Sequence, residues 1–242
     1  MRTLIIPVFN EQSTIFKLVD TIKKSNIFNE IIVVDDGSTD NTNKALLESG
    51  TIYIQHKKNL GKGAALKTGL KAASGNIIMF LDGDIEAIDT AKINKMIELI
   101  ENDNADVVIG TFRFGCFQTF TEVVFKPLTR LFFPEVMKTI KKGFLSGQRA
   151  FKKDVLDKIH LQDDFGVEAA MDIELTFMTP KPRIRHQCLG RTIFRIKGFQ
   201  TSMNSIADTI IAYAKMHGRI DRVDSAFFKK VVQMLNKKIE LL

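Results

Sequence analysis

The sequence predicts an α/β protein with a mostly parallel central sheet flanked by helices. Short apolar runs alternate with helical patterns through the first 110 residues. These runs are almost wholly apolar, as expected for strands that are covered on both faces. At 242 residues and 45% hydrophobic, the chain suits one α/β domain with a C-terminal appendage better than two equal domains.

The apolar runs and the helical patterns place each element. Strands are expected at 4–8, 31–34, 51–55, 77–81 and 106–109, and helices at 12–25, 41–48, 62–73 and 90–102. Proteins with such sheets bind their ligands at the carboxyl ends of the strands. The residues that follow each strand are therefore the first candidates for function.

Cysteine use and hydropathy narrow the class of protein. Cys116 and Cys188 lack the spacing of a zinc site or a disulfide framework, which favours a reducing compartment. No run approaches the roughly 18 apolar residues of a membrane span, and no charged leader precedes the apolar residues 3–9. A cytoplasmic protein is expected.

Positive charge is concentrated in the second half of the chain. The net charge is +7, and residues 126–153 carry eight Lys and Arg against the single acid Glu135. Such a segment indicates a phosphate-bearing partner, which could be a soluble substrate, a nucleic acid or a lipid surface. An ordinary solvated surface is the alternative.

Two polar motifs follow the first two strands. PVFNE (7–11) offers Asn10 and Glu11 after a proline-fixed backbone, and DDGSTDNT (35–42) places Asp36 at a strand end. Carboxylates at this position accept hydrogen bonds from a ribose hydroxyl or a base N–H. Simple helix capping is the alternative, above all for Asp40.

NLGKGAALKTG (59–69) resembles a phosphate loop but matches neither standard motif. Gly63 stands where a Walker A loop needs Ser or Thr, and Leu66 stands where the dinucleotide fingerprint needs its third glycine. A glycine pair, Gly61 and Gly63, still opens a helix beside Lys62. Backbone N–H groups and an ammonium could approach an anion there.

The run IIMFLDGDIE (77–86) ends an apolar strand on three carboxylates, Asp82, Asp84 and Glu86. Like charges so close together are costly unless a cation lies between them. Mg²⁺ or Mn²⁺ is held by a few carboxylates while a substrate supplies phosphate oxygens. We expect Asp84 and Glu86 to be direct ligands and Asp82 to reach the sugar, the ribose or the metal; a charged turn before the next helix is the alternative.

Taken together, IPVFNE, VVDDGSTDNT, NLGKGAALKTGL and FLDGD resemble the family 2 glycosyltransferases with the GT-A fold, particularly the dolichol-phosphate mannose synthase-like branch. The resemblance implies a nucleotide-binding half (1–110) and an acceptor half (111–200) within one domain (1–200), followed by a C-terminal helical appendage (201–242). It implies a nucleoside pocket lined by Pro7, Phe9, Asn10, Glu11 and Asp36. It also implies that Gly61 and Lys62 lie near the base or phosphates, and that the metal and diphosphate site comprises Asp82, Gly83, Asp84 and Glu86.

The acceptor half carries looser matches. FLSGQRAF (144–151) resembles a family strand, which implies that Arg149, with Gln148 beside it, faces an acceptor phosphate or the diphosphate; a buried ion pair is the alternative. FGVEAAMDIE (165–174) resembles a helix start at which Glu168 approaches the acceptor. The basic return loop departs from the family pattern, and the expected substitutes are Arg191, Arg195 and Lys197.

These features predict an inverting glycosyltransferase that depends on Mg²⁺ or Mn²⁺ and uses a UDP- or GDP-sugar, with Asp84, Glu168 and Arg149 as catalytic residues. The expected acceptor is a polyprenyl phosphate or another membrane-associated molecule. A soluble phosphorylated or hydroxyl acceptor is the alternative, and Glu168 would then be the base that a hydroxyl needs. A basic nucleic-acid-binding module is the non-enzymatic alternative, but the acidic strand ends argue against nucleic acid.

Two amphipathic stripes support the membrane expectation. The two stripes comprise Phe117, Phe120, Val124, Leu128 and Leu131, and Phe228, Val232, Leu235, Ile239 and Leu242. Flanked by lysines, such segments can lie in a membrane interface, which predicts peripheral attachment to the inner face of the membrane. Core packing, or a homodimer through the C-terminal helix, is the alternative.

Overall fold

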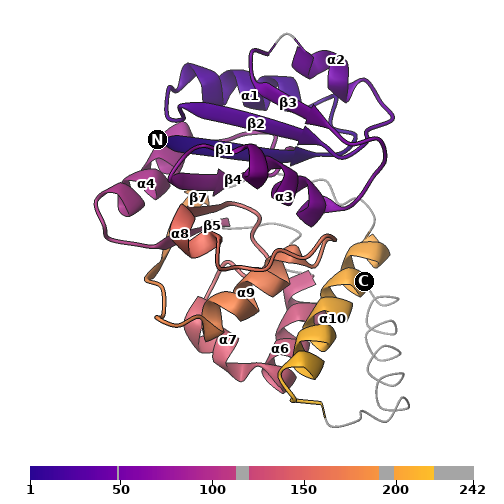
Figure 1. Cartoon of the computed structure of the whole chain (residues 1–242), viewed down its shortest axis with the longest axis vertical. Coiled ribbons are helices and arrows are strands. Elements are labelled where there is room, and N and C mark those ends of the chain that lie inside the picture. Colours follow the sequence, from indigo (N-terminus) through magenta and orange to yellow (C-terminus); the bar gives the residue numbers. More distant parts are fainter. Residues whose placement is uncertain (48, 113–119, 191–198, 221–242) are drawn as a thin grey trace.

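A seven-stranded sheet in the order β3-β2-β1-β4-β6-β5-β7 forms the centre of the protein (Figure 1). The structure is a computed structural model that describes residues 1–47, 49–112, 120–190 and 199–220. Within the sheet, β6 runs antiparallel to its neighbours β4 and β5, and the other paired strands are parallel. The predicted α/β class with a mostly parallel sheet is confirmed.

All nine elements expected in the first 110 residues are present. They are β1 (Arg2–Val8), α1 (Ile15–Lys24), β2 (Glu30–Asp35), α2 (Thr42–Leu47), β3 (Ile52–Gln55), α3 (Lys62–Ala72), β4 (Ile77–Phe80), α4 (Thr90–Glu101) and β5 (Val107–Phe112). The largest differences are three residues, at the start of α1 and the end of β5. Helix α1 starts late because the chain first makes a turn at Glu11, whose carbonyl accepts the N–H groups of Thr14 and Ile15.

The second half adds helices below the sheet and two more strands. Its elements are η1 (Thr121–Phe125, a π-helical turn), α6 (Lys126–Phe132), α7 (Pro134–Ile140), β6 (Arg149–Lys152), α8 (Lys153–Leu156), α9 (Val167–Phe177), β7 (Ile184–Gly190) and α10 (Phe199–Met216). Pro127 sits in the first turn of α6, which follows the π-helical turn η1 directly.

The first amphipathic stripe lies in the core. Phe120, Val124 and Leu128 are buried together with residues of α9 and α10, whereas Leu131 is 54% exposed. Phe117 falls outside the described residues, as does the whole second stripe. The membrane interface expected for the first stripe is therefore wrong for Phe120, Val124 and Leu128, because these three side chains are already covered by protein.

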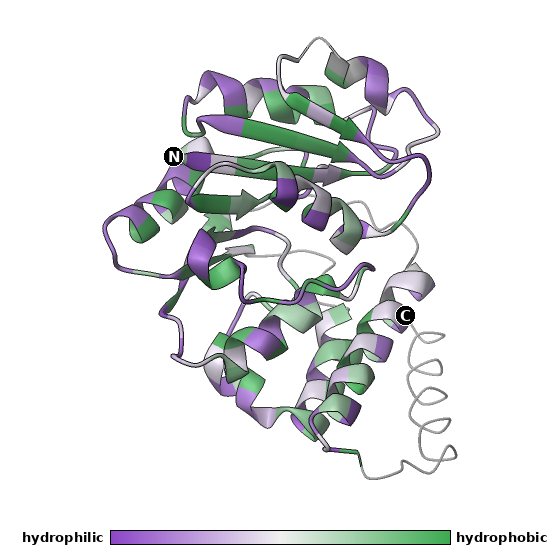
Figure 2. Cartoon of the chain, in the orientation of Figure 1, coloured by the Kyte–Doolittle hydropathy of each residue, from purple (hydrophilic) through white to green (hydrophobic). Residues whose placement is uncertain are grey.

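The sheet separates two apolar clusters, and its strands contribute alternate residues to each. Along β1, Leu4 and Ile6 pack with residues of α1 and α4, whereas Ile5 packs on the opposite face with residues of α3, α9 and α10. Figure 2 shows the strands as mainly hydrophobic. Both faces are covered, which is why the strand segments of the sequence are continuously apolar.

Helix α10 is part of this core although all but its first two residues lie beyond the predicted boundary at residue 200. It buries Met203, Ile206 and Ile210 in the same cluster as the helices of the second half, and lies beside α6 and α9 (Figure 1). The division of the chain into a domain and an appendage stays a prediction. None of the helices in the described ranges is both long and apolar enough to cross a membrane.

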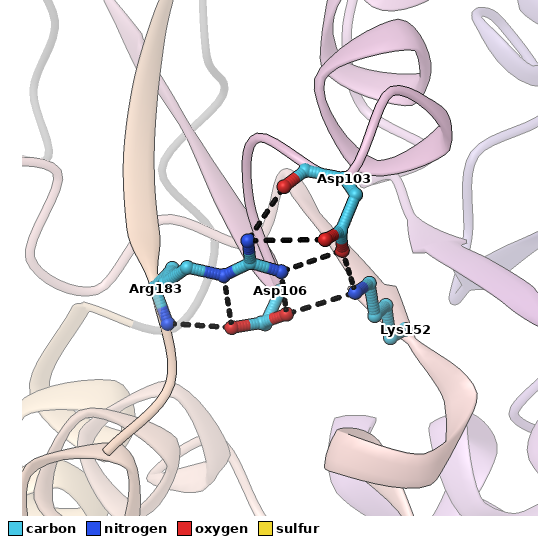
Figure 3. Close-up of polar contacts among 4 residues, drawn as sticks. All are labelled: Asp103, Asp106, Lys152 and Arg183. Carbon is cyan, nitrogen blue, oxygen red and sulfur yellow. Dashed lines mark hydrogen bonds and ion pairs between the residues drawn. The ribbon is translucent and has the colours of Figure 1, made fainter.

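A network of four charged side chains joins the amino ends of β5 and β7 to the end of β6 (Figure 3). Arg183 donates to both carboxylate oxygens of Asp106, at 3.0 and 2.8 Å, and Lys152 lies 3.0 Å from the same carboxylate. Both cations also pair with Asp103. The hydrogen bonds from Arg183, with the hydrogen bond and the charge of Lys152, hold the pKa of Asp106 well below its usual value.

We expect Asp106→Asn to lower the free energy of unfolding by about 1–3 kcal/mol at pH 7, since it removes the charge that two cations share. A carboxyl whose pKa is lowered by folding stabilises the folded state above its unfolded pKa near 4, and this contribution is lost as the pH falls further. Urea unfolding from pH 7 to pH 3 measures both effects. Asp103→Asn is the control and should lower the free energy of unfolding by less, because Asp103 is more exposed. An equal or larger loss of stability in Asp103→Asn would contradict the greater importance of Asp106.

Candidate active site

The loops after β1 and β2 form one surface at the carboxyl edge of the sheet. The Asn10 N–H donates to Ser38 Oγ at 2.9 Å, and Asn10 Oδ1 accepts from the Thr39 N–H at 2.8 Å. Asn10 has a φ of 57°, a left-handed conformation that asparagine tolerates better than most residues. The Glu11 N–H donates to Thr42 Oγ1 at 2.8 Å. PVFNE and DDGSTDNT therefore come together as the parallel sheet predicted.

The residues of the expected nucleoside pocket differ in how accessible they are to a ligand. Pro7 lies inside β1, paired with Val34, whereas Phe9 is 38% exposed and can offer its ring to a ligand. Asp40 accepts the Thr42 N–H at 3.0 Å at the start of α2, which fits the capping interpretation. Binding of a nucleoside by Pro7, Phe9, Asn10, Glu11 and Asp36 stays a prediction.

Asp36 organises the loop that leads from β3 to α3. Its carboxylate is buried and accepts hydrogen bonds from the N–H groups of Leu60 at 2.9 Å and Gly61 at 2.8 Å, and lies 2.7 Å from His56 Nδ1. Sequence reasoning missed His56. It follows β3 directly, so the same rule that selected the other strand ends could have found it.

The glycine pair at the start of α3 packs tightly against the segment 162–164. The N–H groups of Gly63 and Ala64 donate to the carbonyls of Asp164 and Asp163, at 3.3 and 2.8 Å. A Cβ at Gly63 would lie 1.6 Å from the Gln162 carbonyl oxygen. The N–H groups of Gly61, Gly63 and Ala64 therefore already donate within the protein, whereas the expectation that Gly61 and Lys62 lie near the base or phosphates stays a prediction.

Lys62 connects three elements through one ammonium group. Its Nζ lies 2.6 Å from Asp82 Oδ1, 2.5 Å from Glu168 Oε1 and 5.6 Å from the centre of the Phe165 ring. Burial alone would lower the pKa of Lys62, but the charges of Asp82 and Glu168 outweigh it and raise the pKa. The start of α3 is thereby tied both to the tip of β4 and to α9.

The acidic trio follows β4 on a backbone that is fixed against β1. A Cβ at Gly83 would lie 2.5 Å from Val8 Cγ1, and Thr14 Oγ1 donates to the Gly83 carbonyl at 3.1 Å. Asp82 is buried beside Lys62, and Glu86 is partly buried. Among the residues that the structure describes, no three His, Cys, Asp or Glu side chains form a ready metal-holding group. The expected set of Asp82, Asp84 and Glu86 is thus not preassembled.

Asp84 is the member of the trio that best suits a cation. Its Oδ1 is buried and has no hydrogen-bond partner. Burial, together with the charges of Asp82 and Glu11, raises the pKa of Asp84 to about 7. A divalent cation would bind this oxygen and offset the repulsion between Asp84 and the carboxylates of Asp82 and Glu11. Mg²⁺ commonly takes only one or two protein carboxylates alongside substrate phosphates.

Glu168 and Arg149 come from the acceptor half but have different environments. Glu168 lies in the first turn of α9 at the Lys62 contact, and burial raises its pKa. Arg149 is completely buried and pairs with the equally buried Asp172 at 2.7 Å. The expected phosphate contact of Arg149 is therefore wrong for this structure, and the alternative of a buried ion pair is favoured. Arg191, Arg195 and Lys197 lie outside the described residues.

Comparison with known proteins identifies the family. The model of glycosyl transferase family 2 matches residues 3–160, so the chain belongs to this family. The glucosyl-3-phosphoglycerate synthase of Mycobacterium tuberculosis is 28% identical over 196 residues, which is 71% of this chain and 60% of that protein. The chain thus spans less than two thirds of the length of this relative.

Two further comparisons bear on the ligands. A crystal structure of the Mycobacterium tuberculosis synthase in complex with Mn²⁺, UDP and phosphoglyceric acid is 25% identical, with a TM-score of 0.77, and covers 88% of this chain and 76% of that one. The dodecaprenyl-phosphate galacturonate synthase of Rhizobium johnstonii is 30% identical over 118 residues, covering 45% of this chain and 35% of that protein. The GT-A fold is confirmed, whereas the dolichol-phosphate mannose synthase-like branch stays a prediction.

We expect Asp84→Asn to stabilise the metal-free protein at pH 8 by about 1–3 kcal/mol, because it removes a buried charge. A carboxyl whose pKa is raised by folding makes the folded state less stable as the pH climbs from about 4 to 7, so the gain should shrink towards pH 4. Urea unfolding in the presence of a chelator measures it. Glu86→Gln, two residues away, is the control and should change stability less. A difference between wild type and Asp84→Asn that does not depend on pH would contradict this account.

Proposed function

We propose that this chain is a metal-dependent glycosyltransferase that transfers a hexose from a UDP- or GDP-sugar to a phosphorylated acceptor. The observation that carries the proposal is the unpaired, buried oxygen of Asp84 at the carboxyl edge of the sheet. Family membership over residues 3–160 supports the class of reaction. The relative crystallised with Mn²⁺ and UDP supports the choice of cation and of a nucleoside diphosphate.

The charges of the site fit a divalent cation with a diphosphate. When ionised, Glu11, Asp82, Asp84 and Glu168 supply four negative charges against the single positive charge of Lys62, which leaves a net charge of −3. Glu11, Asp82 and Lys62 all act on the ionisation of Asp84. Asp84 would hold Mg²⁺ or Mn²⁺, with Asp82 and Glu86 as further ligands. When bound, the cation would stabilise the negative charge that grows on the departing nucleoside diphosphate.

The residues of the chain would then divide the remaining tasks. Phe9 would stack against the base, while Asn10 and Asp36 would orient the nucleoside. The ammonium group of Lys62 is part of the protein itself, and it would add positive charge next to the diphosphate. Glu168 would accept the proton of an attacking hydroxyl, and the lysine ammonium 2.5 Å away favours its ionised form.

A soluble phosphorylated acceptor has the stronger support. The similarity to glucosyl-3-phosphoglycerate synthase covers 71% of the chain, and phosphoglyceric acid is present in the crystallised relative. The buried packing of Phe120, Val124 and Leu128 also removes part of the reason for expecting a membrane-bound acceptor.

A lipid phosphate is the second candidate acceptor. It is favoured by the similarity to dodecaprenyl-phosphate galacturonate synthase, which covers 45% of the chain. A lipid phosphate is already ionised and needs no base, so Glu168 would not be required for proton transfer. Peripheral membrane binding, a homodimer through the C-terminal helix and inversion at the sugar all stay predictions.

We expect Asp84→Ala to lower turnover by about 100-fold or more while the protein stays folded, because the cation loses its best ligand. The measurement is UDP or GDP release from UDP-glucose, UDP-galactose and GDP-mannose with 3-phosphoglycerate and Mn²⁺. The effect of Mn²⁺ on nucleotide binding by calorimetry should disappear in the same variant. Unchanged turnover and binding in folded Asp84→Ala would overturn the proposed function.

The acceptor class is tested with two acceptors and one variant. We expect turnover with 3-phosphoglycerate to exceed turnover with a polyprenyl phosphate in vesicles, and Glu168→Gln to lower it by about 100-fold. Faster transfer to the lipid, with little loss in Glu168→Gln, would favour the second candidate. The anomeric configuration of the sugar product, read by NMR, tests the predicted inversion.

A further inference from the structure

The loop before β6 holds the Asp82 carboxylate from the side opposite Lys62. Gln148 Nε2 donates to Asp82 Oδ2 at 2.7 Å, while Asp82 Oδ1 faces the Lys62 ammonium at 2.6 Å. Both oxygens of this carboxylate therefore have a partner that comes from another element. Only 1% of the surface of Gln148 is exposed, so its amide is fixed within the protein.

The neighbouring glycine makes this contact possible. A Cβ at Gly147 would lie 2.4 Å from each of the two Asp82 carboxylate oxygens. The carboxylate thus rests directly on the backbone of residue 147, and any side chain there would push it away. Gly147 has no positive φ, so its role is to leave space.

The loop is itself anchored to the sheet. The Ser146 hydroxyl donates to the Gly110 carbonyl of β5 at 2.7 Å, and the Gln148 N–H donates to Ser146 Oγ at 3.3 Å. The Leu145 N–H donates to Asp172 of α9 at 3.3 Å. The backbone that carries Gln148 is therefore held both by β5 and by α9.

The chemistry of the donor matters as well as its position. A neutral amide orients a carboxylate without cancelling its charge, whereas a second cation at this place would reduce the attraction of the site for a metal ion. Hydrogen bonds from outer residues to metal ligands typically set both the orientation and the affinity of the site. Gln148 supplies such a bond to the Asp82 carboxylate, which pairs with Lys62 and whose charge acts on Asp84.

We propose that Gln148, seated beside Gly147, is a positioning residue that orients the Asp82 carboxylate for binding a divalent cation and the nucleoside diphosphate. This inference rests on the proposed function, since it assumes that Asp82 belongs to the metal and diphosphate site. It assigns Gln148 a role through Asp82, which differs from the direct phosphate contact expected from the sequence.

Gln148→Met tests the hydrogen bond, because methionine nearly keeps the volume and removes the donor. We expect Mn²⁺ to bind about 10–100-fold more weakly in the presence of UDP, measured by electron paramagnetic resonance titration. In turnover assays kcat should fall by a similar factor, while the KM for the acceptor changes less than about twofold. Gln187→Met is the matched control, because the Gln187 amide donates to the Cys188 carbonyl of its own strand and not to the acidic site.

Gly147→Ala provides an independent test that leaves the Gln148 amide in place. The added methyl should displace the Asp82 carboxylate and weaken Mn²⁺ binding to a similar extent, and thermal unfolding identifies any variant that is not folded. Folded variants that bind Mn²⁺ as wild type does would overturn the inference. Failure of the wild type itself to bind Mn²⁺ with either UDP or GDP would instead overturn the proposed function, so the two failures are distinguishable.

Discussion

The pairing of the Lys62 ammonium with Asp82 and Glu168 is the interaction on which the site depends. Carboxylates buried so close together would repel one another and unfold the loops that carry them. One lysine at the start of α3 offsets part of this repulsion and joins the tip of β4 to α9. At Asp84, one buried carboxylate oxygen has no hydrogen-bond partner. The same arrangement that keeps the metal-free protein folded therefore leaves a place for a cation.

The antiparallel strand β6 explains how the two halves of the chain reach this site. It enters the sheet between β4 and β5, so the loop before it emerges at the carboxyl edge beside Asp82. At the opposite end of the same strand, Lys152 joins the ion-pair network of Asp103, Asp106 and Arg183. The short strand β6 thus has the ion-pair network at its carboxyl end and the acidic site at its amino end.

The elements of the first half could be predicted because their signals are local. Continuous apolar runs such as residues 77–80 mark strands that are buried on both faces, and polar residues at their ends mark the edge where ligands bind. These local signals suffice to place Asn10, Asp36 and the acidic trio at one edge of the sheet. The boundaries of α1 and β5 are harder to predict, because turns and strand pairing extend or shorten an element without changing its pattern.

The sequence by itself determined the fold class, the family and the set of acidic side chains at the sheet edge, since each depends on residues close together along the chain. Only the tertiary structure decided what these side chains contact. In the tertiary structure the N–H groups of Gly63 and Ala64 donate to carbonyls of the segment 162–164. Arg149 pairs with Asp172, and Gln148 donates a hydrogen bond to Asp82. These contacts join residues that lie far apart in the sequence. No local pattern specifies them, because they depend on how helices and loops pack across the completed sheet.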